Sequence, residues 1–96
     1  MIHGESGGLF EKVVVSTTPV GFTTTQVDGR SATRAVCTLD GGDVRIRYDG
    51  PGPTATTGLY LIDKDVFIIE GIDNVRRFKA IRAGAVNVNL NGILES

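Results

Sequence analysis

The clearest structural pattern in the sequence lies in Val44-Arg45-Ile46-Arg47-Tyr48-Asp49-Gly50-Pro51-Gly52-Pro53-Thr54. Its first five residues alternate between apolar and basic side chains. This period of two places the apolar side chains on one face of a β-strand and the guanidinium groups on the other. We expect the strand to end at the Asp-Gly turn pair, because the prolines that follow lack the backbone donors that a continuing strand needs. The stretch therefore predicts one amphipathic strand followed by a kinked loop.

Short strand patterns recur along the rest of the chain, with turn residues between them. Beside the strand at 44–48, we expect strands over residues 12–18, 20–27, 33–39, 59–62, 66–69, 76–82 and 85–90. No segment keeps apolar residues at helical spacing across two turns. This pattern predicts an all-β fold, a small antiparallel β-sandwich of the immunoglobulin-like kind, with about seven strands.

Three more detailed expectations concern pairing and burial. The glycine-centred turn at residues 40–43 predicts a β-hairpin between the strands 33–39 and 44–48. The nearly all-apolar run Val66-Phe67-Ile68-Ile69 predicts the most buried strand. The apolar alternation predicts one shared core, formed by Ile46, Tyr48, Phe67, Ile69, Phe78, Val86 and Val88.

The chain is short enough for one domain only, which we place at residues 12–96, preceded by an N-terminal arm at residues 1–11. The arm is rich in glycine but carries two adjacent apolar residues, Leu9 and Phe10. We expect it to dock on its own domain or on a neighbour, so that the chain works as a homo-oligomer or a shell-bound subunit. The alternative is a disordered tail with two incidental apolar residues.

Charge and hydropathy argue against two classes of partner, although a local basic patch remains open. The 96 residues include 10 basic and 11 acidic ones, a formal net charge of −1, which gives no support for bulk nucleic-acid binding. No apolar run approaches the length of a membrane span. The first residues lack the pattern of a signal peptide, so we expect a protein made in the cytoplasm.

Catalytic and metal-binding chemistry finds little support. His3 is the only histidine and stands in the arm, where it cannot be held against a nucleophile. Cys37 lies in a strand pattern and is expected to be a buried apolar residue. A zinc site needs more Cys and His ligands than these two. The aspartates in turns are expected to hydrogen-bond their own turns, with a calcium site as an alternative. We therefore expect no enzyme, no cofactor and no metal.

Basic side chains gather on two of the expected strands, and two interpretations remain open. They are Arg45, Arg47, Arg76, Arg77, Lys79 and Arg82. The first interpretation is the solvated face of a sheet. The second is one contiguous basic strip, formed if the two strands are neighbours, that would suit an acidic protein surface or phosphate groups. The candidate partner-binding residues are Leu9, Phe10, Arg45, Arg47 and Arg77.

Two resemblances attach to these residues. The segments Ile46-Arg47-Tyr48-Asp49-Gly50, Pro53-Thr54 and Phe78-Lys79-Ala80-Ile81-Arg82-Ala83-Gly84 resemble the small β-sandwich module appended to chitobiases and related hydrolases. The chain is one residue shorter than that module's pattern between Tyr48 and Asp49. The module is non-catalytic in that family.

The second resemblance spans residues 33–84. It adds Thr33-Arg34-Ala35 and Pro53-Thr54-Ala55-Thr56-Thr57-Gly58 to the segments above, and it is to small structural proteins encoded by tailed bacteriophages. Those proteins usually have Asp-Pro where this chain has Gly52-Pro53. The resemblance implies a virion component, such as a capsid decoration or cement protein or a head-tail accessory, whose partner is the major capsid protein or another virion protein. It implies no assigned site residue.

The sequence thus leaves two functional hypotheses. One is a non-enzymatic virion structural protein that binds the particle through its arm and one sheet face. The other is a carbohydrate-binding or spacer module of a tail fibre or a hydrolase. The lack of Trp, together with the expected burial of Tyr48, Tyr60 and Phe67, weighs against sugar binding.

Overall fold

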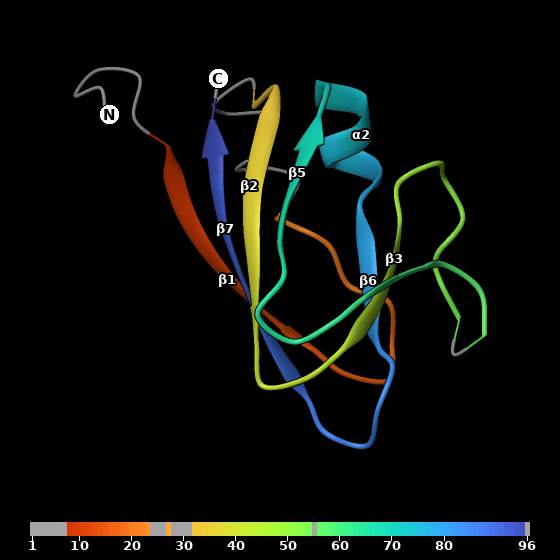
Figure 1. The fold of residues 1–96 in the computed structure, drawn as a ribbon. Helices are drawn as coiled ribbons and strands as arrows, with labels where there is room; N and C mark the ends of the chain where they lie inside the picture. Colours follow the sequence, from red (N-terminus) through yellow and green to blue (C-terminus); the bar gives the residue numbers. More distant parts are fainter. Residues whose placement is uncertain (1–7, 24–26, 28–31, 55, 96) are drawn as a thin grey trace.

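The computed structural model describes residues 8–23, 27, 32–54 and 56–95 of the chain. Seven strands and one short helix lie in this part of the chain (Figure 1). They are β1 (Leu9–Val15), β2 (Arg34–Asp40), β3 (Val44–Arg47), β4 (Leu59–Leu61), β5 (Val66–Glu70), α2 (Ile72–Arg77), β6 (Lys79–Arg82) and β7 (Val88–Glu95).

The strands form two antiparallel sheets that pack as a sandwich. The four-stranded sheet has the order β1-β7-β2-β5, and the three-stranded sheet has the order β4-β3-β6. This architecture confirms the predicted all-β sandwich of seven strands. The last strand, β7, lies between β1 and β2 in the four-stranded sheet. In a constant immunoglobulin domain, by contrast, the first two strands are in one sheet and the last strand is in the other, with the third and sixth.

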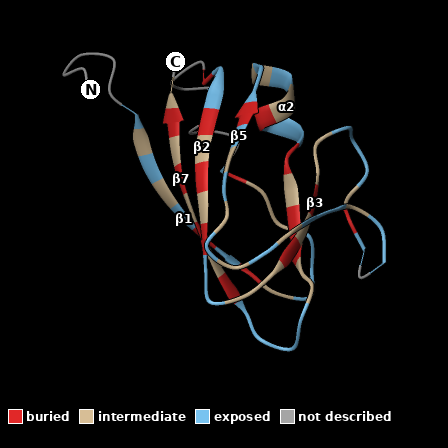
Figure 2. Cartoon of the chain, in the orientation of Figure 1, coloured by how far each residue is buried: buried red, intermediate tan, exposed pale blue. Residues whose placement is uncertain are grey.

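The core lies between the two sheets, and buried residues alternate with less buried ones along β2, β3 and β7 (Figure 2). Two aromatic rings, of Phe22 and Phe78, lie in the core, and the partly buried Phe67 packs against it. The ring of Phe22 stacks on that of Phe78, with the ring centroids 5.3 Å apart. The ring of Phe67 also contacts Phe78, at a tilt, with the centroids 6.1 Å apart. Of the predicted core residues, Ile46, Ile69, Phe78 and Val88 are buried, and Tyr48 and Phe67 pack against them partly buried.

The predicted hairpin between residues 33–39 and 44–48 is wrong, because β2 and β3 belong to different sheets. The turn at Gly41, whose φ is +110°, carries the chain across the sandwich instead. Two aspartates hold this corner against the turn at 62–65. Asp43 accepts a hydrogen bond from the Asp63 amide at 2.8 Å, and Asp63 accepts one from the Gly41 amide at 2.9 Å. These carboxylates therefore join two turns, rather than each closing its own.

Two burial predictions are also wrong. The run at 66–69 forms β5, an edge strand whose Val66 and Ile68 face outward and are 68% and 50% exposed. A continuous apolar run indicates burial on both faces only if something covers the second face. Val86 is exposed as well, because β7 begins two residues later, at Val88.

The segments 20–27 and 76–82 also differ from the predicted strands. Residues 24–26 lie outside the described part of the chain, and the segment before them makes only an isolated bridge, between Val20 and Ala80. Residues 72–77 form α2, which leads from β5 to β6 at one end of the sandwich (Figure 1). The side-chain amide of Asn74 donates to the Glu70 carbonyl at 2.9 Å, which fixes this turn onto the end of β5.

The predicted arm extended to residue 11, but β1 begins at Leu9 and pairs along its length with β7. Residues 1–7 lie outside the described part of the chain. Leu9 packs against the core of its own domain, and Phe10 points outward. The two adjacent apolar residues therefore occupy opposite faces of one strand.

Candidate interaction surface

An apolar row crosses the outer face of the four-stranded sheet, the face turned away from the core. Residues paired directly across antiparallel strands point to the same face. Phe10 in β1 is paired with Ile93 in β7, Ile93 with Val36 in β2, and Val36 with Ile68 in β5. Phe10 is 57% exposed and Ile68 is half exposed, and the two central residues are partly exposed. We call these four residues the apolar row.

Polar side chains border the apolar row on one side. Arg34 in β2 lies between Glu95 in β7 and Glu70 in β5 in the sheet register. The Nε atom of Arg34 donates to Oε1 of Glu95 at 2.7 Å. A surface ion pair of this kind contributes little to stability, but it fixes the positions of two charges.

On the other side of the apolar row, three polar side chains and one apolar side chain form the next row of the sheet. Lys12 in β1, Asn91 in β7 and Thr38 in β2 form the next row, which ends at the exposed Val66 in β5. The outer face thus has an apolar centre and a largely polar rim. This is the anatomy of many protein–protein interfaces, and exposed apolar patches on soluble domains commonly mark them.

The predicted basic strip exists only in part. β3 and β6 are neighbours, as the strip requires, and Arg47 is paired with Lys79. Arg77, however, lies on α2 rather than on a strand. Two other cations have local partners, because Arg76 pairs with Asp73 at 3.2 Å and Arg82 donates to Asn87 at 2.8 Å. Much of the positive charge is therefore already engaged within the chain.

Arg45 takes part in a cluster with Tyr60 and Asp43 on the outer face of the three-stranded sheet. Its guanidinium lies over the Tyr60 ring, 5.0 Å from the centroid, and donates to the Gly58 carbonyl at 3.2 Å. The Tyr60 hydroxyl donates to Oδ2 of Asp43 at 2.7 Å. This hydrogen bond raises the pKa of Tyr60 and, together with the Asp63 amide, lowers the pKa of Asp43. Tyr60 is 51% exposed, so the prediction that it is buried is wrong.

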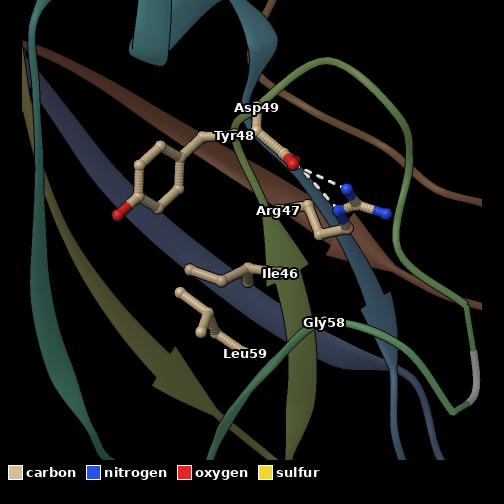
Figure 3. A pocket seen from close by; sticks show the side chains of 6 residues that line it. All are labelled: Ile46, Arg47, Tyr48, Asp49, Gly58 and Leu59. Atoms are coloured by element: carbon tan, nitrogen blue, oxygen red, sulfur yellow. Dashed lines mark hydrogen bonds and ion pairs between the residues drawn. The ribbon is translucent and has the colours of Figure 1, made fainter.

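A pocket of about 330 Å³ opens beside β3 and β4 (Figure 3). In this view, apolar side chains lie to one side of β3, and an ion pair between Arg47 and Asp49 lies to the other. Nε and Nη2 of Arg47 donate to the two oxygens of Asp49 at 2.9 and 2.6 Å, which raises the pKa of Arg47 and lowers that of Asp49. The lining residues are Ile46, Arg47, Tyr48, Asp49, Gly58 and Leu59.

The ionisable pair that lines this pocket is engaged with itself, because Arg47 and Asp49 hydrogen-bond each other. The residues that line the pocket include no cysteine and no histidine. Cys37 lies elsewhere, buried in the core, where burial raises the pKa of its thiol to about 12. Such a thiol stays protonated and unreactive at neutral pH.

Within the part of the chain that the structure describes, no three His, Cys, Asp or Glu side chains gather closely enough to hold a metal ion. Of the helices described, none is long and apolar enough to cross a membrane. His3 lies outside the described residues.

The structure separates the five candidate partner-binding residues. Phe10 belongs to the apolar row, whereas Leu9 points inward from the same strand. Arg45 and Arg47 lie on the other sheet, and Arg77 lies on α2. Sequence reasoning missed the other three members of the apolar row. Val36 and Ile68 lie in expected strands, but Ile93 lies beyond the last expected strand, at 85–90. The three become one surface feature only when the strands are aligned.

Comparison of the chain with models of protein families, with curated proteins and with solved structures finds no match in any of the three.

Proposed function

We propose that this chain is a non-enzymatic structural protein that docks to another protein surface through the outer face of its four-stranded sheet. The observation that carries the proposal is the apolar row, which stays exposed although the strands that bear it also form the core. Exposed apolar side chains cost solubility, and burying them against a partner stabilises a complex by about 25 cal/mol per Å².

The setting we propose is the virion of a tailed bacteriophage, with the chain as a capsid decoration or cement protein or a head-tail accessory. The support is the resemblance of residues 33–84 to small phage structural proteins. In that setting the sheet face would contact another subunit of the particle, either a different virion protein or a second copy of this chain. The basic residues Arg45 and Arg47 become secondary candidates, since Arg47 is already paired with Asp49.

The experiment is mass spectrometry of phage particles. Particles are induced from the bacterium that carries the coding sequence, banded in a density gradient and digested. A virion component gives peptides of this chain at a constant ratio to the major capsid protein across the particle band. If the peptides stay at the top of the gradient with free host proteins, the chain is not a virion component and the proposed setting is wrong.

A second candidate function is glycan binding, and one observation favours it. Tyr60 is an exposed aromatic with a guanidinium and a carboxylate beside it, a combination that suits the faces and hydroxyls of sugars. A glycan array probed with the purified chain tests this candidate, with Tyr60→Ala as the matched variant. Binding that disappears in the variant favours the glycan function, and an empty array removes it.

A further inference from the structure

We propose that the partner of the apolar row is a second copy of this chain, stacked face to face on the four-stranded sheet about a two-fold axis. The inference rests on the proposed function in one respect, namely that this face is a docking surface. It goes further by naming the occupant and the geometry.

The strand order suggests the axis. The strands of the sheet lie in the order β1-β7-β2-β5. A two-fold axis parallel to the strands and midway between β7 and β2 places β1 of one copy over β5 of the other. The same axis places β7 of one copy over β2 of the other. Phe10 then faces Ile68 of the second copy, and Ile93 faces Val36. Stacked sheets keep their strands within about 30° of each other, so these facing pairs stay close neighbours. The apolar row is thus complementary to itself.

The charges of the rim agree with the same axis. Arg34 of one copy faces Glu95 of the other, and the same contact repeats across the axis. The intramolecular pairs of the two copies would then form one network of alternating sign. Lys12 of one copy faces the exposed Val66 of the other. Glu70 of one copy faces Gly8 of the other, just before β1 begins. None of these contacts brings two like charges together. Isologous interfaces require this kind of self-complementarity.

A second two-fold axis could also stack the two faces, one that lies in the interface plane and runs perpendicular to the strands, but it fits less well. An axis running along the apolar row would place Phe10 on Phe10 of the second copy and Val66 on Glu70. The exposed valine would then be buried against a carboxylate, which costs free energy unless the carboxylate finds a partner. The axis parallel to the strands places Val66 against Lys12 instead, whose alkyl stem can cover the valine while its ammonium group stays in water at the edge of the sheet.

The size of the face indicates whether it could hold a specific dimer. Four strands about 4.8 Å apart and seven residues long at about 3.3 Å per residue span roughly 19 by 23 Å. Stacking two such faces covers roughly 900 Å² in projection, and side-chain relief adds to it, so the interface falls at the lower end of specific ones. We therefore expect a dimer with a micromolar dissociation constant.

The first test is sedimentation velocity of the whole chain over a concentration series. Wild type should pass from monomer to dimer, and Phe10→Lys and Ile68→Asp should each weaken the dimer by at least about tenfold. The double variant, Phe10→Lys with Ile68→Asp, should recover dimerisation, because each lysine then faces an aspartate of the other copy. Within one copy the two positions lie on the outer strands of the sheet, too far apart to pair. The control is Val86→Asp, at an equally exposed loop position.

A second test fixes the axis. A Phe10→Cys chain mixed with an Ile68→Cys chain should form a disulfide-linked heterodimer under mild oxidation, faster than either variant alone links to itself. Cross-linking of Phe10→Cys to itself at the higher rate would overturn the proposed axis. A wild type that stays monomeric up to roughly 500 µM would overturn the dimer.

The two proposals fail separately. If the chain is monomeric but its peptides band with phage particles, the face binds another virion protein and the second-copy inference is wrong. If the chain is dimeric but absent from particles, the inference stands and the virion setting is wrong.

Discussion

The ring of Phe22 lies directly against the backbone of Gly92, so that a Cβ atom at position 92 would come within 2.6 Å of the ring. Gly92 lies in β7 between Glu11 of β1 and Cys37 of β2, on the inner face of the four-stranded sheet. The missing side chain leaves the space that the aromatic centre of the core fills. Phe22 in turn stacks on Phe78, so this one glycine sets the packing of both rings.

We expect Gly92→Ala to destabilise the fold by about 1–3 kcal/mol, the usual cost of forcing an extra carbon into a packed core. The measurement is the free energy of unfolding in urea. Gly84→Ala is the matched control, since nothing lies within 4 Å of a Cβ at that position, and it should change stability by less than about 0.5 kcal/mol. Equal effects at the two positions would mean that Phe22 does not pack on Gly92.

The fold class could be predicted because alternation is a local property. Residues 44–48 alternate, and β3 presents Val44 and Ile46 inward as expected. The pairing of β2 could not be predicted, because a glycine turn at residue 41 serves equally for a hairpin and for a crossing between sheets. In the folded chain, β2 pairs with β5 and β7 instead of β3, and a hydrogen bond from the Asp63 amide to Asp43 holds the crossing in place.

The candidate site was harder to predict for a related reason. Phe10 was singled out, but as part of a flexible arm. Val36 and Ile93 were not singled out, and Ile68 was assigned to the strand expected to be the most buried. These residues become one surface only through the register of four strands drawn from distant parts of the sequence, which no local pattern contains.

A charge introduced at Leu9 should destabilise the fold much more than the same charge introduced at Phe10. We expect Leu9→Asp to lower the free energy of unfolding by roughly 2 kcal/mol, because the carboxylate would point toward the core without a partner. Phe10→Asp should change it by less than about 0.5 kcal/mol in dilute monomer, because that side chain points to solvent. Urea unfolding of both variants at low protein concentration checks this. A large loss for Phe10→Asp alone would place Phe10 in the core and reverse the register of β1.

The hydrogen bond between Tyr60 and Asp43 should give the stability a pH dependence at both extremes. The pKa of Asp43 is lowered from 3.8, so its contribution is present above that pH and is lost as the pH falls through the folded value. The pKa of Tyr60 is raised from 10.0, so its contribution is present below that pH and is lost as the pH rises through the folded value.

Tyr60→Phe tests this dependence, because it removes the hydroxyl and keeps the ring beneath Arg45. The melting temperature of wild type should exceed that of the variant between about pH 5 and pH 9, and the two curves should converge outside this window. Asp43→Asn should reproduce the convergence on the acid side. A difference that stays constant from acid to alkaline pH would show that the hydrogen bond is not responsible.

The most direct measurement is the occupancy of phage particles by variants of the apolar row. Particles are produced from strains that carry wild type, Ile68→Asp or Val86→Asp, and the ratio of this chain to the major capsid protein is quantified by mass spectrometry. Ile68 and Val86 are similarly exposed, but only Ile68 lies in the apolar row. Docking through the outer sheet face predicts wild-type occupancy for Val86→Asp and a loss of at least about tenfold for Ile68→Asp. Equal occupancy of all three, or no chain in any particle, would contradict it.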